Sequence, residues 1–156
     1  MITGNLVLTL PDAGAADSDV QGNAATHWME AASAADIDLE GFSLTASLDE
    51  RLVWARRHGL GVGTIYSRFS TTFQHSTEDQ IRTNVDGAAR KGIYIPHEFI
   101  CLDEAASGRR SRRAGLDRVK FLLENDLADT LVVFALSRLF RKQHKAARFI
   151  EEEIIE

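Results

Sequence analysis

Arg68 and Ser70 are the two side chains whose types and spacing most directly suggest chemistry. They are two residues apart in the stretch GTIYSRFSTTFQHSTEDQ at residues 63–80, so on an extended chain they project to the same face. The residues before Ser70 favour a strand, and those from Ser76 onward favour a helix that Ser76 can cap. This predicts a hydroxyl and a guanidinium together at a strand-to-helix turn. The simpler alternative is that Arg68 is a strand-edge charge and Ser70 a turn residue.

Further arginines follow two other predicted strands. Arg138 and Arg141 come directly after the apolar run at residues 131–136, and their spacing of three places them on one face of a helical turn. Arg113 closes a second group, SGRRSRR at residues 107–113, which follows another predicted strand. The carboxyl ends of parallel strands meet at one edge of a sheet. We therefore expect these arginines to converge with Ser70 on one pocket.

A hydroxyl surrounded by guanidinium groups suits a phosphodiester substrate. The transition state of phosphoryl transfer spreads negative charge over oxygen atoms, which the planar, permanently charged arginine side chain can contact in pairs. Positioning and charge stabilisation carry most of this reaction, so a metal is optional when enough arginines are present. The histidines are scattered and form no recognisable metal-binding pattern. We expect no metal and no other cofactor.

Two other functions remain open from the residues alone. Asp103 and Glu104 could hold Mg²⁺ in a phosphotransferase or nuclease, although the simpler interpretation is a loop acid pair that balances the neighbouring arginines. Alternatively, the arginines bind phosphate or DNA in a non-catalytic module in which Ser70 is only part of a turn.

Alternating apolar patterns predict an α/β domain. Three strand–helix repeats argue for a mainly parallel central sheet with flanking helices and right-handed connections. The run at residues 131–136 is continuously apolar, as expected of a central strand covered on both faces. The predicted strands cover residues 64–69, 98–102 and 131–136, and the predicted helices cover residues 76–91, 113–124 and about 143–155.

The first 62 residues are harder to interpret. Residues 1–46 are acidic and rich in Ala, Gly, Asp and Ser, which predicts a flexible or loosely packed N-terminal extension. Ser47 opens a capping box for a helix that Gly59 ends, and Gly59, Gly61 and Gly63 then suggest a linker. The domain organisation predicted is an extension (1–46), a helix with a Gly-rich linker (47–62) and a catalytic domain (63–156).

Composition places the chain among globular proteins. With 156 residues, of which 44% are hydrophobic, it can form one domain with a core. The N-terminal apolar run is too short to span a bilayer, so we expect no membrane partner. The single cysteine, Cys101, cannot form an internal disulfide, which favours a cytoplasmic protein. We expect Cys101 to be buried. Residues 1–63 carry three arginines and nine carboxylates, a net of −6, whereas residues 64–156 carry fifteen basic and fourteen acidic residues, a net of +1. A local basic patch is therefore compatible with the acidic total.

The ordered motifs of the second part resemble those of the serine recombinase family, which comprises resolvases, invertases and large serine integrases. The resemblance covers about residues 63–156 and is specific as a set, although each motif alone is weak. The motifs are YSRFST at residues 66–71, STEDQI at 76–81, DEAASG at 103–108 with RAGL at 113–116, and SRLFR at 137–141.

The resemblance implies a resolvase-type catalytic domain in which Ser70 attacks the DNA backbone, forms a 5′-phosphoserine link and releases a 3′ hydroxyl. It implies that Arg68, Arg113, Arg138 and Arg141 hold the scissile phosphate and that Gln80 orients a phosphate oxygen or the serine, with Gln74 a less certain member. The implied partner is double-stranded DNA, cut and rejoined by homodimers that pair into a tetramer.

The sequence departs from this family in three respects. Ser137 stands where many members have an aspartate before the arginine pair, so the general base stays unassigned. More than sixty residues precede the first motif. The chain ends before the long dimerisation helix and DNA-binding domain of the family, so we expect a fragment or truncated member with weak or no recombination by itself.

Overall fold

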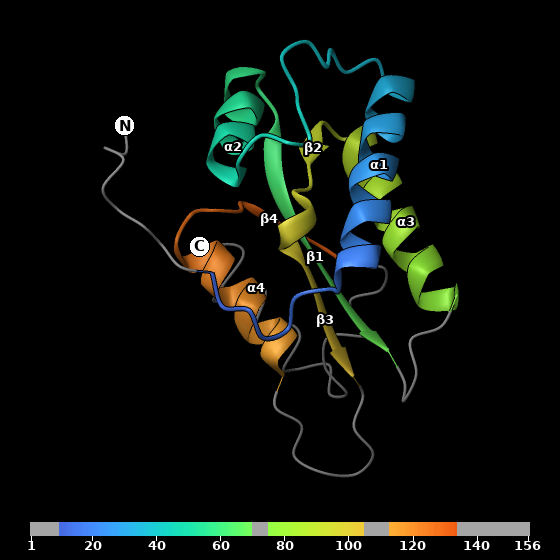
Figure 1. Ribbon diagram of the computed structural model, residues 1–156, viewed down its shortest axis with the longest axis vertical. Helices are drawn as coiled ribbons and strands as arrows, with labels where there is room; N and C mark the ends of the chain where they lie inside the picture. Colours follow the sequence, from blue (N-terminus) through green and yellow to red (C-terminus); the bar gives the residue numbers. More distant parts are fainter. Residues whose placement is uncertain (1–9, 70–74, 105–112, 134–156) are drawn as a thin grey trace.

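The computed structural model describes residues 10–69, 75–104 and 113–133. Within these residues the chain forms a parallel sheet with helices on both sides (Figure 1). The helices are α1 (Ser18–Ala34), α2 (Leu48–Arg57), α3 (His75–Arg90), the short 3₁₀ helix η1 (His97–Phe99) and α4 (Ala114–Glu124). The strands are β1 (Gly61–Phe69), β2 (Ile93–Tyr94), β3 (Ile100–Glu104) and β4 (Thr130–Val132).

The strand at the centre of the sheet is β1, which pairs in parallel with β2, β3 and β4. Ile65 is in register with both Ile100 of β3 and Val132 of β4, so these two strands lie on opposite edges of β1. Figure 1 shows α1 and α3 together on one side of the strands, and α2 and α4 on the other. This arrangement confirms the predicted α/β class with a mainly parallel sheet and flanking helices.

The prediction that residues 131–136 form the central strand is wrong. Leu131 and Val132 of that run belong to β4, whose residues are only half-buried, whereas residues 62–67 of β1 are buried. A strand is buried on both faces when helices cover both, and α3 and α4 do this for β1. The predicted last helix, about residues 143–155, lies outside the described residues.

The glycines predicted to form a linker are largely part of β1. Only Gly59, with φ of +72°, ends α2 in a conformation that favours glycine. Gly61 begins the strand, and a Cβ atom on Gly63 would come within 2.7 Å of the Ile95 side chain and 2.9 Å of the Ile93 side chain. Gly63 therefore allows the segment around β2 to pack closely on β1.

Helix boundaries are close to those predicted, whereas the second strand is displaced. The helices α3 and α4 begin and end within one residue of the predicted bounds, and the Ser47 hydroxyl accepts a hydrogen bond from the Glu50 N–H at 3.2 Å, as the capping box predicts. The helix α3 is described from His75 onward, so capping by Ser76 stays a prediction. The predicted strand at 98–102 instead begins at Ile100, because Pro96 opens a turn in which its carbonyl accepts from the Phe99 N–H at 2.8 Å.

The expectation that the N-terminal extension is flexible or loosely packed is wrong for residues 10–46. The segment before α1 lies antiparallel to the outer edge of β3, where the Ala16 N–H donates to the Ile100 carbonyl at 3.0 Å and the Leu102 N–H donates to the Gly14 carbonyl at 2.8 Å. This pairing covers backbone groups that would otherwise be exposed at the sheet edge.

Trp28 anchors α1 to the rest of the domain. Its side chain is 1% exposed, its ring lies against Tyr94 and Phe42, and its indole N–H donates to the Ile93 carbonyl at 3.0 Å. The other buried positions of α1 are mostly alanines, which let the helix approach its neighbours closely. A composition poor in large apolar residues therefore still produces a packed helix, because one tryptophan supplies much of the buried area.

Replacing Trp28 with phenylalanine is expected to lower the free energy of unfolding by about 1 to 2 kcal/mol, because the Ile93 carbonyl loses its buried donor. Urea denaturation measures this change. Val53→Ala is the matched control: Val53 is 49% exposed, so its truncation should change stability by less than about 0.5 kcal/mol. Equal effects of the two changes would contradict the assigned role of Trp28.

None of the helices in the described ranges is long and apolar enough to cross a membrane.

Candidate active site

Arg68 lies near the carboxyl end of β1, in register with Asp103 of β3. Its side chain is half-buried, and its Nε atom is buried without a hydrogen-bond partner among the described residues. A buried guanidinium nitrogen of this kind favours contact with an anion, since an unsatisfied charged donor costs free energy. Ser70, which directly follows β1 in the sequence, lies outside the described residues.

Asp103 organises this end of the sheet through three hydrogen bonds. Its buried carboxylate accepts from the Tyr66 hydroxyl at 2.8 Å, from the Gly115 N–H at 2.7 Å and from the Leu116 N–H at 3.1 Å. The two backbone donors belong to the first turn of α4, where N–H groups have no partner within the helix. Asp103 thus fixes the start of α4 against β1 and β3.

Tyr66 stays protonated in this arrangement. Burial and the hydrogen bond to Asp103 raise the pKa of Tyr66 well above its ordinary value, and the nearby charges of Arg113 and Arg68 oppose the shift. Arg68 is in register with Asp103, and Arg113 is two residues before Gly115, whose N–H donates to Asp103. Tyr66 and Arg68 are two apart in β1 and share a face of the strand, whereas Arg113 immediately precedes α4. The structure thus brings Arg68 and Arg113 together around the Tyr66–Asp103 pair.

Gln80 lies on the other face of the sheet, in α3. Its nearest polar partner from β1 is Ser67, whose hydroxyl donates to the Gln80 Oε1 atom at 3.5 Å, the outer limit of a hydrogen bond. Successive side chains of a strand point to opposite faces, so Ser67 and Arg68 face different layers. The structure therefore places Gln80 near the same end of β1, but does not bring it into the Arg68–Arg113 group.

Gln74, Ser137, Arg138 and Arg141 lie outside the described residues.

The paired-carboxylate metal site does not agree with the geometry of Asp103 and Glu104. They are the last two residues of β3 rather than a loop pair, so their side chains point to opposite faces. The Asp103 oxygens already accept three hydrogen bonds, whereas Glu104 is exposed. Among residues 10–69, 75–104 and 113–133, no group of three His, Cys, Asp or Glu side chains could hold a metal ion.

Cys101 is buried in β3, and burial raises its pKa to about 12. The thiol is therefore protonated at neutral pH and is not a nucleophile.

Sequence reasoning missed the Tyr66–Asp103 pair and the role of Gly115. A Cβ atom on Gly115 would come within 2.5 Å of the Leu102 carbonyl oxygen, so only glycine lets α4 begin this close to β3. The spacing of Tyr66 two residues before Arg68 was the available signal, since it places a phenol and a guanidinium on one strand face. The position of Asp103 at the end of a strand and shortly before a helix was a second one.

The family model described as "Resolvase, N terminal domain" matches residues 64–153, which is more than half of the chain. The match begins inside β1 and includes α3, β3, α4 and β4, whereas α1 and α2 precede it. Searches for similar curated proteins and for similar solved structures returned no match.

Proposed function

The chain belongs to the resolvase family of serine recombinases, and from this premise we propose that Ser70 is the nucleophile that attacks a DNA phosphodiester. Membership of the family makes this a protein of DNA recombination. The observation that supports the site is the gathering of Arg68 and Arg113 around Tyr66 and Asp103, at the strand end that Ser70 follows directly.

In the proposed reaction, the Ser70 oxygen forms a bond to phosphorus while the bond from phosphorus to the 3′ oxygen breaks. The serine loses its proton, the 3′ oxygen gains one, and the 5′ phosphate stays linked to the protein. A 3′ hydroxyl from the exchanged strand then attacks the phosphoserine and restores the serine. Arg68 and Arg113 stabilise the charge that develops on the phosphoryl oxygens, and one such donor contributes about 10²- to 10³-fold in rate.

We further propose that Arg138 and Arg141 join this site. They follow β4, which is parallel to β1, and the carboxyl ends of parallel strands face one edge. Gln80 is proposed to orient a phosphate oxygen or Ser70 from the α3 side, with Gln74 a weaker candidate. Arginine stays protonated, so none of these arginines serves as the general base.

The proposed partner is double-stranded DNA, cut by paired dimers that assemble into a tetramer. We propose residues 63–156 as the part of the chain that carries the catalytic residues.

The proposal is tested by incubating the full-length protein with supercoiled plasmid that carries the DNA flanking its gene, in the presence of EDTA. Denaturing gels then separate free DNA from DNA linked to protein. We expect a covalent adduct, because the proposed reaction needs no metal. DNA cleavage that EDTA abolishes would favour a metal-dependent nuclease, and DNA binding without an adduct would favour a non-catalytic module.

A further inference from the structure

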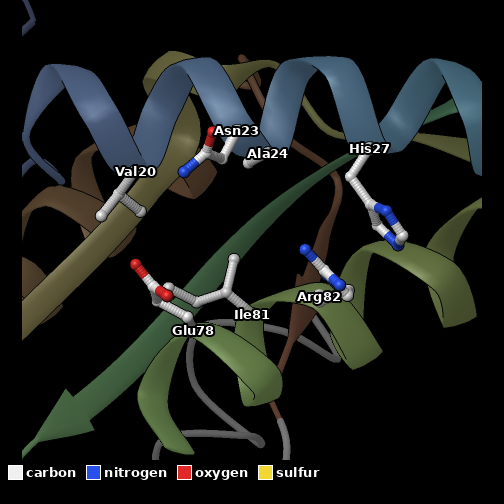
Figure 2. Close-up of a pocket in the computed structure, with 7 residues that line it drawn as sticks. All are labelled: Val20, Asn23, Ala24, His27, Glu78, Ile81 and Arg82. Carbon is white, nitrogen blue, oxygen red and sulfur yellow. The ribbon is translucent and has the colours of Figure 1, made fainter. Parts of the chain in front are cut away.

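The helix α1 precedes the matched family range, yet it packs along α3, the helix that carries Gln80. Figure 2 shows the contact, with Val20 and Ala24 of α1 facing Ile81 of α3. We infer that α1 positions α3, and through it Gln80, so that residues outside the matched range are a working part of the recombinase site. This inference rests on the proposed function.

Two polar contacts hold α1 to α3 and to the strand that follows it. The His27 Nε2 atom lies 2.6 Å from the Asp86 Oδ1 atom of α3. The adjacent Trp28 donates to the Ile93 carbonyl in β2, three residues after α3 ends. The first contact acts on the second half of α3 and the second on β2, while Val20 and Ala24 pack on Ile81 near Gln80. The helix is therefore held along most of its length.

The residues of α3 itself explain why an outer support matters. The second half of the helix contains Gly87, Ala88 and Ala89, and both alanines are 1% exposed. Short side chains bury little apolar area, at roughly 25 cal/mol per Å². Val85, which is 0% exposed, is the one larger apolar side chain that this half buries, and the contacts from α1 add to its packing.

The space between the two helices does not suggest a ligand site. The cavity lined by Val20, Asn23, His27, Glu78 and Arg82 measures about 50 Å³. Small-molecule sites enclose roughly 300–1,000 Å³, so this space suits a few water molecules. The contact between α1 and α3 is accordingly a packing interface.

The test compares His27→Ala, His27→Gln and Arg56→Ala in the full-length protein. Arg56 is the matched control, since its Nη1 atom lies 2.6 Å from the Asp129 Oδ2 atom and so joins α2 to the residue before β4. The readouts are the rate of adduct formation at saturating plasmid DNA, the DNA affinity from gel shifts, and the melting temperature. Glutamine keeps a donor for Asp86.

We expect His27→Ala to slow adduct formation by about 3- to 10-fold, since a slightly misplaced group costs rate, with DNA affinity unchanged. His27→Gln should recover most of the rate. Arg56→Ala should shift the melting temperature by a similar amount and leave the rate unchanged. Equal rates for His27→Ala and Arg56→Ala, or no recovery with glutamine, would overturn the inference. Failure of the unmodified protein to form any adduct would instead overturn the proposed function.

Discussion

Replacing Ser70 with alanine is expected to abolish the covalent protein–DNA adduct while leaving DNA binding nearly unchanged. The hydroxyl oxygen is the atom proposed to bond to phosphorus, and the arginines that contact the phosphate remain in place. Because phosphate contacts supply most of the affinity for DNA, loss of one hydroxyl should have little effect on binding. Denaturing gels measure the adduct, and gel shifts measure the affinity.

Ser67→Ala is the matched control for this experiment. Ser67 is in the same strand and is 5% exposed, but its hydroxyl contacts only Gln80 among the described residues, at 3.5 Å. A hydrogen bond of this length is weak, so adduct formation should be largely retained. An undiminished adduct in Ser70→Ala would show that another side chain is the nucleophile.

Replacing Asp103 with alanine is expected to lower the free energy of unfolding by about 3 to 5 kcal/mol. The change leaves the Tyr66 hydroxyl and the first N–H groups of α4 without their acceptor. Asp103→Asn keeps one acceptor oxygen and should give an intermediate loss. Urea denaturation measures the free energy of unfolding of both variants. Adduct formation should also fall, because the start of α4, next to Arg113, is no longer ordered.

Glu104→Ala separates this structural role from metal binding. Glu104 adjoins Asp103 in β3 but is exposed, so its removal should change stability by less than about 0.5 kcal/mol. It should also leave adduct formation intact. If both carboxylates instead held a magnesium ion, the two alanine variants would lose activity together and excess magnesium would partly restore it.

The second part of the fold could be predicted from sequence because local patterns and tertiary structure agree there. Helices α3 and α4 have regular apolar spacing, and the strand before α3 alternates, so three strand–helix units were visible. The N-terminal part was mispredicted because its stability depends on contacts distant in sequence. Trp28 packs on Tyr94, and the segment before α1 pairs with β3. Neither contact produces a pattern in the local sequence.

The candidate site was predictable only in part. The serine and arginine spacing indicated phosphate chemistry, and the structure places Arg68 beside Asp103 and Arg113 two residues before Gly115, which donates to Asp103. The hydrogen bonds by which Asp103 links β1, β3 and α4 were indicated only weakly by the spacing of Tyr66 and Arg68, because they also depend on the register that places Arg68 beside Asp103. The same register explains why Gln80 lies on the opposite face, since its helix covers the side of β1 that Ser67 faces.

The most direct test of the central claim identifies the bond between protein and DNA. The adduct formed in EDTA is digested with protease and nuclease, and mass spectrometry locates the nucleotide-bearing residue. We predict a 5′-phosphate ester on Ser70, with free 3′ hydroxyls on the cut DNA. A nucleotide on any other residue, or a link through a 3′ phosphate, would contradict the account.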